Sequence, residues 1–350
     1  FYVRPKRPRS QSLVLVEEYG IGRARLELGA RVERERSRPA DVVVGDVEGI
    51  LLPGGSMLPL PETLPTRRAR SLSLSAGMVG PLAEGHLWRA SASRSQRTPS
   101  PEQLYAFGRH PAAGTFEIGD PHLREETYLH LEAGLEGHHG RFDYALTLFR
   151  TRADDYVFLA TEDDGSGRPV LVNDLGQRPG EGGTGACGPD DGGDCRFRNR
   201  LVFNQQADAR FHGAELALGL RLGEGPVATA LRASADRVRG RLASGGDLPR
   251  ITPPRYGLGF DAGWRDWSLG LDLQRVMPQR RVAAAESPTD GFTLVGFDLR
   301  WTPEAMGGNT QLFLRGRNLR NVDGRLHQGF FKDEAPILGR AITAGVRIGF

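Results

Sequence analysis

The sequence predicts an all-β fold, a transmembrane antiparallel β-barrel, and three observations support this prediction. Apolar and polar residues alternate with a period of two along most of the chain, as they do in 71–78 and 342–350. The apolar side of each segment continues for roughly 9–11 residues, the length that a tilted strand needs to cross hydrocarbon. The expected connections alternate between short and long, as in a barrel with tight turns at one rim and long loops at the other.

Thirteen strands are expected, and the chain is expected to end at the short-turn rim because its last strand follows a long connection. An odd number of strands indicates the C-terminal part of a larger barrel. The strands are expected near 11–20, 23–36, 67–79, 86–96, 124–138, 141–159, 199–222, 226–243, 254–265, 267–279, 291–302, 309–319 and 340–350. The short connections are 20–22, 80–85, 138–139, 223–225, 265–266 and 303–308, and the long ones are 37–66, 97–123, 160–198, 244–253, 280–290 and 320–339.

The polarity of these strands places the apolar side chains against lipid and the Arg, Glu, Asp and Ser side chains in a wet lumen. The backbone of such a sheet is satisfied in lipid only if the sheet closes on itself. A soluble β-sandwich or a propeller is the alternative. A propeller would show a repeat of roughly 40–50 residues, and the sequence shows none.

The composition excludes several other classes of protein. Charged residues make up 25% of the chain and leave no apolar run long enough for a membrane-spanning helix. Short apolar runs recur throughout the chain, which argues against disorder. The formal net charge is only +3, and the arginines are spread along the strands instead of forming one patch, so nucleic-acid binding has no support.

The two cysteines, Cys187 and Cys195, lie in a loop rich in glycine and aspartate. This spacing suits a small disulfide formed in an oxidising compartment. A metal site is the other interpretation, but no second cysteine pair or nearby histidine completes four ligands.

Several motifs resemble those of the TonB-dependent outer-membrane receptors. The longest begins with the Ser-Arg-Ser-Gln-Arg-Thr-Pro-Ser-Pro run at 93–101 and continues through the Gly-Arg-His-Pro loop to Pro121. Further segments of this kind are 204–215, 315–319 and the terminal segment 339–350, which ends in Phe350. Within the family, the loop around His110, the closing pattern 331–340 and the opening segment 1–5 most resemble the zinc-uptake receptors.

This resemblance implies a 22-stranded barrel with an N-terminal plug, of which residues 1–350 would be about the last thirteen strands, without the plug. It implies a location in the outer membrane of a Gram-negative cell, in contact with outer-membrane lipid. It also implies uptake of an extracellular metal or metal complex, energised by TonB–ExbB–ExbD through the missing N-terminal region. No enzymatic activity and no resident cofactor are expected, and the transported ligand is expected to be Zn²⁺.

The expected zinc ligands lie in the long connections, because long loops face the outside of the cell and carry ligand capture. His110 is the first candidate, since the resembling receptors have a histidine at this place; a histidine that only packs the loop is the alternative. The others are Asp120 and His122 at the return of the loop, Glu117, and His327 near Asp323 and Asp333. The other interpretation of Glu117, and the favoured one, is that it orders the loop by accepting backbone N–H bonds.

Other polar groups receive competing interpretations. Asp163, Asp164, Asp190, Asp191 and Asp194 would either concentrate cations or form a solvated loop. His86, His138 and His139 are expected at the short-turn rim, away from the ligand. A receptor for an iron chelate or haem is a second interpretation, and it would use Arg97, Arg109 and Tyr105. The alternative for the aromatic residues is that they pack the loop; these are Tyr105, Phe107 and Phe116. An outer-membrane enzyme is a remote alternative, because no serine has a paired histidine and acid.

Overall fold

The computed structural model describes residues 6–38, 50–51, 57–58, 66–173, 176, 178, 198–306 and 309–349. Thirteen long strands form one antiparallel sheet in which each strand pairs with the next long strand along the chain. This confirms the thirteen strands and their order. They are β1 (Lys6–Ile21), β2 (Ala24–Arg38), β5 (Arg67–Ala83), β6 (His86–Arg97), β9 (Glu126–His139), β10 (Phe142–Thr161), β12 (Asn199–Glu224), β13 (Val227–Leu242), β14 (Arg255–Trp264), β15 (Trp267–Val276), β16 (Phe292–Trp301), β17 (Thr310–Arg317) and β18 (Ala341–Ile348).

The long connections carry short elements that the period-two pattern did not predict. A single-turn helix, α1 (Pro101–Tyr105), is followed by a small hairpin of β7 (Phe107–His110) and β8 (Thr115–Ile118). β8 then joins the main sheet by pairing in parallel with β12, and β11 (Leu171–Val172) pairs with the same strand. The ladder of β3 (Ile50–Leu51) and β4 (Met57–Leu58) also lies in a long connection, whereas the 3-10 helix η1 (Glu304–Met306) lies in the short connection after β16.

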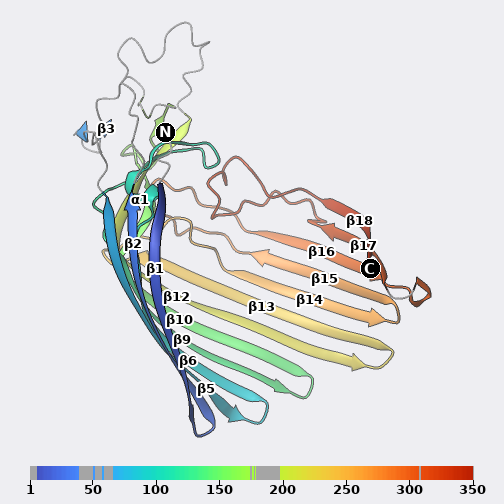
Figure 1. The fold of residues 1–350 in the computed structure, drawn as a ribbon. Helices are drawn as coiled ribbons and strands as arrows, with labels where there is room; N and C mark the ends of the chain where they lie inside the picture. Colours follow the sequence, from blue (N-terminus) through green and yellow to red (C-terminus); the bar gives the residue numbers. More distant parts are fainter. Residues whose placement is uncertain are drawn as a thin grey trace.

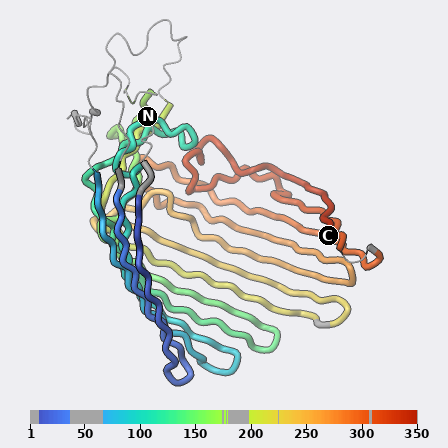
Figure 2. Tube along the Cα trace, viewed as in Figure 1, coloured from blue at the N-terminus to red at the C-terminus, as the bar shows by residue number. Residues whose placement is uncertain are grey.

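The sheet curves as a wall, with the tight turns at one end and the long connections gathered at the other (Figure 1). The trace shows that the two ends of the wall, β1 and β18, stand apart (Figure 2). No pairing between them occurs among the described strands. One expected turn was misplaced: His138 and His139 still belong to β9, and the turn falls at Gly140, where φ is +59°. No helix in the described part of the chain is long and apolar enough to cross a membrane.

The register separates the strands into two faces. One face carries mainly apolar residues such as Leu131, Leu148 and Leu220, and we call it the exterior face. The opposite face carries polar residues, and we call it the lumen face. On that face Arg89 donates to the Thr147 hydroxyl at 2.6 Å across β9 and lies 3.5 Å from Glu132. Because the lipid-facing surface of a membrane barrel is apolar, the separation into an apolar and a polar face agrees with the predicted polarity of the barrel.

The expectation that arginines face the lumen is wrong near the long-loop end. Arg150 and Arg152 follow Leu146 and Leu148 at alternate positions of β10, so they share the exterior face. The alternation along the strand predicts correctly which residues share a face, whereas the charge of a residue does not predict that it faces the lumen. The exterior face therefore changes from apolar to basic along the strand.

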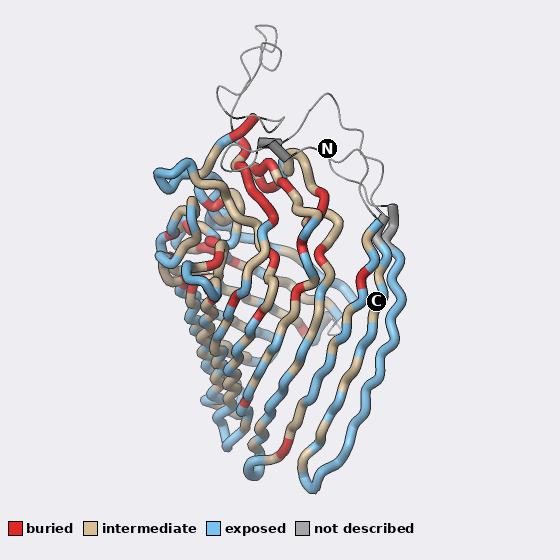
Figure 3. Tube along the Cα trace, turned by 90° about the vertical axis from the view of Figure 1, so that its left-hand side faces the viewer, coloured by how far each residue is buried: buried red, intermediate tan, exposed pale blue. Residues whose placement is uncertain are grey.

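Buried residues are concentrated at the long-loop end, as Figure 3 shows, whereas the lower parts of the strands are mostly exposed or half-buried. One cluster joins Ala153 of β10, Ala209 of β12 and Leu248 from the β13–β14 connection. Another joins Leu104 and Tyr105 of α1 to other buried residues, among them Leu123. The connections thus pack over the lumen face and hold one another in place.

Glu126, at the start of β9, joins three parts of this end of the sheet. Its carboxylate is buried and forms an ion pair with Arg97 of β6. It also accepts hydrogen bonds from the Tyr128 hydroxyl and from the backbone N–H of Val157 in β10, both at 2.8 Å. A buried carboxylate with three donors is stabilising only while the donors remain paired.

Replacement of Glu126 by alanine is therefore expected to lower the free energy of unfolding of the complete barrel by about 2–4 kcal/mol, because a buried N–H and a guanidinium lose their acceptor. Urea titration of the folded protein in vesicles measures this. The control is Glu132→Ala, which removes a half-exposed partner of Arg89 and should cost less than about 1 kcal/mol. Equal losses for the two variants would contradict the assignment.

Candidate functional site

Local sequence signals position the loop that carries His110. Ser100 caps α1 by accepting from the Gln103 backbone N–H at 3.3 Å, and the Gln103 side chain accepts in return from the Ser100 N–H at 2.9 Å. Pro101 occupies the first helical position, where its missing N–H costs nothing. Gly119 then lets β8 return against α1, because a Cβ there would lie 2.5 Å from the Tyr105 nitrogen. The hairpin of β7 and β8 is thereby fixed beside the helix.

His110 and Glu117, two of the predicted zinc ligands, lie together in this hairpin. Nδ1 of His110 lies 2.7 Å from Oε1 of Glu117, and the Thr115 hydroxyl donates to the same oxygen at 3.0 Å. The Glu117 side chain is 15% exposed and that of His110 is 35% exposed. In the part of the chain that the structure describes, Glu117 accepts from these side chains and from no backbone N–H group. A carboxylate that holds Nδ1 fixes the ring and makes Nε2 the nitrogen that would carry a metal.

Asp120 and His122 form a separate local turn. The backbone N–H of His122 donates to Oδ1 of Asp120 at 2.8 Å, and the His122 side chain is exposed. Within the described part of the chain, no group of three or more histidine, cysteine, aspartate or glutamate side chains is arranged to hold a metal ion. The five metal ligands inferred from the sequence therefore stay predictions.

His327 lies in a buried charged cluster built from two connections. Its Nε2 is 3.2 Å from Oε1 of Glu286, without the alignment of a hydrogen bond, and its Nδ1 is 3.1 Å from the Thr289 hydroxyl. The Lys332 ammonium lies 3.1 Å from the same Glu286 oxygen and 3.4 Å from Nδ1 of His327. The cation beside His327 is thus an ammonium group of the protein, and a metal ion would have to displace it.

Glu286 organises this cluster. In addition to its ion-pair contacts with His327 and Lys332, it accepts hydrogen bonds from the backbone N–H groups of Arg250 at 2.9 Å and Ala283 at 3.0 Å. Burial would raise the pKa of Glu286, but these contacts outweigh it and lower the pKa to about 2. Burial lowers the pKa of Lys332, and the nearby Glu286 carboxylate opposes that shift.

A cavity of about 770 Å³ opens beside the cluster, between β12 and the long connections. No local sequence pattern predicts this cavity, because its charged lining comes from connections far apart in the chain. Arg200 donates to the Phe330 carbonyl at 2.7 Å and lies 3.1 Å from Asp333, while the Arg250 guanidinium covers the Phe330 ring at 4.3 Å. Its charged lining residues are Arg168, Arg200, Asp247, Arg250, Glu286, Lys332 and Asp333.

The aromatic residues of the His110 loop pack that loop, as one of the two interpretations predicted. Tyr105 is buried, and Phe107 meets Phe116 edge to face with ring centroids 5.2 Å apart. Asp163 accepts from the backbone N–H groups of Gly165 and Gly167, so it shapes a turn. Cys187 and Cys195, with Asp190, Asp191 and Asp194, lie outside the described residues.

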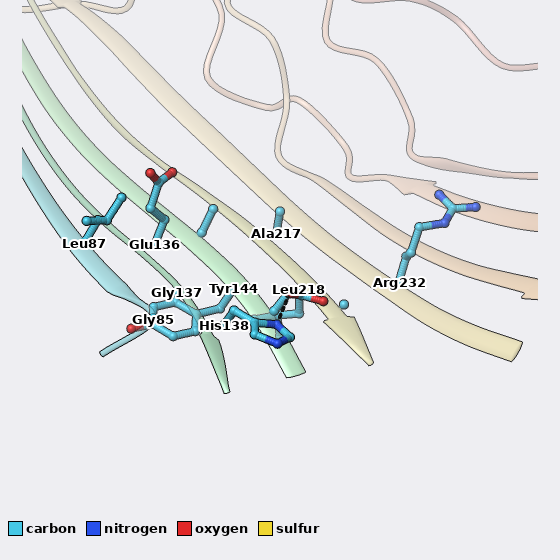
Figure 4. Close-up of a pocket in the computed structure, with 12 residues that line it drawn as sticks. Gly85, Leu87, Glu136, Gly137, His138, Tyr144, Ala217, Leu218 and Arg232 are labelled. Carbon is cyan, nitrogen blue, oxygen red and sulfur yellow. Dashed lines mark hydrogen bonds and ion pairs between the residues drawn. The ribbon is translucent and has the colours of Figure 1, made fainter. Parts of the chain in front are cut away.

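The histidines of the short-turn rim lie where β9 ends and β6 begins, and Figure 4 shows His138 beside the pocket at this rim. His138 lines a shallow pocket of about 520 Å³, and its Nδ1 is 2.6 Å from Oδ1 of Asp143. His86 bonds the Tyr144 hydroxyl at 3.0 Å and stacks on His139. These contacts agree with the expectation that the three histidines belong to the short-turn rim.

The fold defines an outer-membrane β-barrel protein. Residues 2–319 match the family model described as "TonB dependent receptor-like, beta-barrel", and the chain belongs to this family. It is similar in structure to a protein named "Copper transporter OprC", with 18% identity over 98% of this chain and 48% of that chain, and a TM-score of 0.69. The FrpB iron transporter from Neisseria meningitidis (F3-3 variant) gives 13% identity over 99% and 45%, with a TM-score of 0.63.

A third similar structure is the ferric-catecholate import receptor Fiu from K12 E. coli, with 14% identity over 98% of this chain and 45% of that chain, and a TM-score of 0.62. The chain therefore spans about half the length of the solved structures that it matches. At these identities the likeness shows the fold alone.

Acid should release the cluster around Glu286. Because the folded-state pKa of Glu286 is about 2 and its ordinary value is 4.5, its stabilisation is fully present above about pH 4.5 and is lost as the pH falls toward 2. We expect hydrogen exchange in the 323–333 segment of the complete receptor to accelerate over this window. Glu286→Gln should show fast exchange already at pH 7, whereas Asp290→Asn, which alters an exposed pair with Arg280, should not. Slow exchange in Glu286→Gln at pH 7 would refute this role.

Proposed function

We propose that the complete receptor that carries this chain imports a metal-bearing solute across the outer membrane, with energy from the TonB–ExbB–ExbD complex. Membership in the TonB-dependent receptor family supports this class of transport. Transporters of copper and iron are among the structures with a similar fold. The energising complex would act through a region outside this chain, and the chain would supply the wall and the extracellular connections.

Zinc is the first candidate for the solute, and the contact between His110 and Glu117 carries this proposal. A histidine oriented by a carboxylate is the usual arrangement around protein-bound zinc. His110 would bind the ion through Nε2, and Glu117 would fix the ring rather than act as a ligand. Water or groups of the solute would complete the four positions that zinc prefers. A site with few protein ligands suits a protein that must release its ion.

Replacement of His110 by alanine is expected to lower uptake of radioactive zinc by at least about 10-fold at limiting zinc, and Glu117→Gln by several-fold, because loss of an orienting partner typically costs 10–100-fold in affinity. Uptake is measured in cells that express the complete receptor. His139→Ala, at the opposite rim, is the matched control. Unchanged zinc uptake in His110→Ala would contradict the proposal that His110 binds zinc.

An anionic metal chelate is the second candidate, and the cavity between the long connections favours it. Arg168, Arg200, Arg250 and Lys332 line this cavity, and guanidinium groups bind carboxylates in a two-pronged manner. Arg200 and Arg250 already hold Phe330 and Asp333, so they also support the wall of the cavity. Arg168 is exposed and is the cation whose loss should disturb the wall least.

Arg168→Gln is expected to weaken binding of ferric citrate, used as a small anionic probe, by about 10-fold, since a charge-assisted hydrogen bond contributes roughly 1.5–3 kcal/mol. Titration calorimetry with the complete receptor measures the dissociation constant. Arg280→Gln removes an exposed arginine of a neighbouring connection and should leave it unchanged. Equal affinities for the wild type and Arg168→Gln would contradict a chelate in this cavity.

A further inference from the structure

The exterior face of β10, β12 and β13 becomes basic at the same height on all three strands. In each strand a run of apolar residues at alternate positions leads into positively charged residues near the long-loop end. On β10 the sequence on this face is Phe142, Tyr144, Leu146 and Leu148, followed by Arg150 and Arg152. On β12 the sequence on this face is Leu220, Leu218, Leu216 and Ala214, followed by His212 and Arg210. On β13 the sequence on this face is Leu231, Ala233 and Ala235, followed by Arg237, Arg239 and Arg241.

The register aligns these residues into two basic rows across the sheet. Arg150 is directly opposite His212, which in turn is opposite Arg239. One step nearer the rim, Arg152 is opposite Arg210, and Arg210 is opposite Arg241. Side chains at such positions have Cβ atoms roughly 4.5–5.5 Å apart, and like charges there are destabilising. A sheet that places its arginines in this way needs negative charge from somewhere else.

The protein supplies little of that negative charge. Arg152 donates to Asp154 at 2.8 Å, and Arg241 lies 3.9 Å from Asp247. Among the residues that the structure describes, no acidic side chain lies within ion-pair distance of Arg150, Arg210, Arg237 or Arg239, and Nε of Arg239 is buried without a hydrogen-bond acceptor. These arginines differ from those of the lumen face, where Arg232 pairs with Asp261 at 2.6 Å and with Asp272 at 3.1 Å.

A ligand in the lumen cannot be the partner of these rows. At the same height the lumen face carries Ala153, Ala209 and Phe211, which pack with Leu248 of a long connection. The basic side chains point to the opposite side of the sheet, where Arg150, Arg152, Arg210 and Arg241 are exposed. The environment on that side, in a barrel of this family, is the outer membrane.

The height of the rows fits the polar region of the outer leaflet. At the short-turn end the same face carries aromatic residues, including Phe142, Tyr144 and the stacked pair of Trp267 and Trp301, which mark one membrane interface. Arg150 lies eight positions beyond Phe142, which corresponds to roughly 20 Å along the membrane normal for a strand tilted by about 45°. The apolar band of such barrels is about 25 Å tall, so Arg150 lies just inside its upper edge and Arg152, two positions further along β10, reaches that edge. The long arginine side chains can extend from these positions to the headgroups.

The same change occurs on β2 and β5. There Arg34 is opposite Arg70 and Arg36 is opposite Arg68, directly beyond the apolar pair of Val32 and Leu72. These strands lie well before β10 in the chain, so the two groups of arginines arose from different stretches of sequence. Their common position above the apolar band indicates one common partner.

We propose that the arginines of the exterior face bind the phosphate groups of phosphorylated lipids in the outer leaflet of the outer membrane. A guanidinium binds a phosphate through two parallel hydrogen bonds, remains charged at every physiological pH and is less strongly hydrated than an ammonium. Phosphates between the rows would neutralise the repulsion that the register creates. The strongest site is the surface formed by Arg150, Arg210, Arg237 and Arg239.

The test compares the complete receptor with a variant in which these four arginines are replaced by glutamine. Both are reconstituted in phosphatidylcholine vesicles that contain either bisphosphorylated lipid A or the same lipid without its phosphates. We expect the wild type to gain several degrees in melting temperature from the phosphorylated form only, and the variant to lose most of this gain. Retained lipid A per barrel, measured by native mass spectrometry after purification, should fall at least about 3-fold.

A control variant separates this effect from general loss of charge or failure to fold. It replaces Arg89, Arg221, Arg232 and Arg255, which lie on the lumen face, by glutamine and should keep the lipid-dependent gain. In vesicles without phosphorylated lipid the exterior variant should fold at least as well as the wild type, because its like charges are removed. Folding is scored by the heat-dependent migration of the barrel in gels.

Three outcomes would overturn the proposal. The first is an unchanged gain and unchanged lipid retention in the exterior variant. The second is an equal loss in the lumen variant, which would make net charge the cause. The third is an equal gain in melting temperature from inorganic phosphate alone, which would show a site for free anions instead of lipid.

Discussion

The alternation of side chains along a strand is the constraint on which the rest of this structure depends. Because neighbouring residues point to opposite faces, each strand presents one row to lipid and one to water, and a slip by a single residue would exchange the two. The register keeps these rows aligned over thirteen strands. On the lumen face the alignment brings Arg232 beside Asp261 and Arg89 beside Thr147. On the exterior it brings leucines together lower down and arginines together near the long loops.

This constraint explains how much the sequence could predict. Period two, sustained over many residues, identified all thirteen strands and their order, and errors were confined to strand ends, as at His138 and His139. The helix α1 was missed because one turn has no periodicity; its signal was the Ser100–Gln103 capping pair. The contact between His110 and Glu117 is a local one, because the two residues are seven positions apart and lie on the two strands of one hairpin. The contacts of Glu286 with His327 and Lys332 could not be predicted, because 40 or more residues separate Glu286 from each of them along the chain.

Burial at the long-loop end arises from a few buried charges as well as from apolar packing. Glu126 joins β6, β9 and β10, and Glu286 joins the connections that precede β14, β16 and β18. Each carboxylate loses hydration but gains several donors, so removal of one partner leaves the others unpaired in a poorly solvated place. The rim is thus held by interactions that tolerate little movement of the backbone. A capture site built on such a rim keeps its shape before the ligand arrives, which lowers the cost of binding.

Arginine serves three different purposes in this chain, and the surroundings of each guanidinium distinguish them. In the lumen Arg232 has two carboxylates within 3.1 Å, so its charge is neutralised inside the protein. In the rim cavity Arg250 lies over Phe330, and burial lowers its pKa while Glu286 opposes that shift. On the exterior face Arg210 stands opposite Arg152 and Arg241, and among the described residues no acidic side chain lies within ion-pair distance of Arg210 itself. The count of arginines in the sequence cannot separate these cases, because only the register and the contacts show which charges the protein has matched and which it leaves to its surroundings.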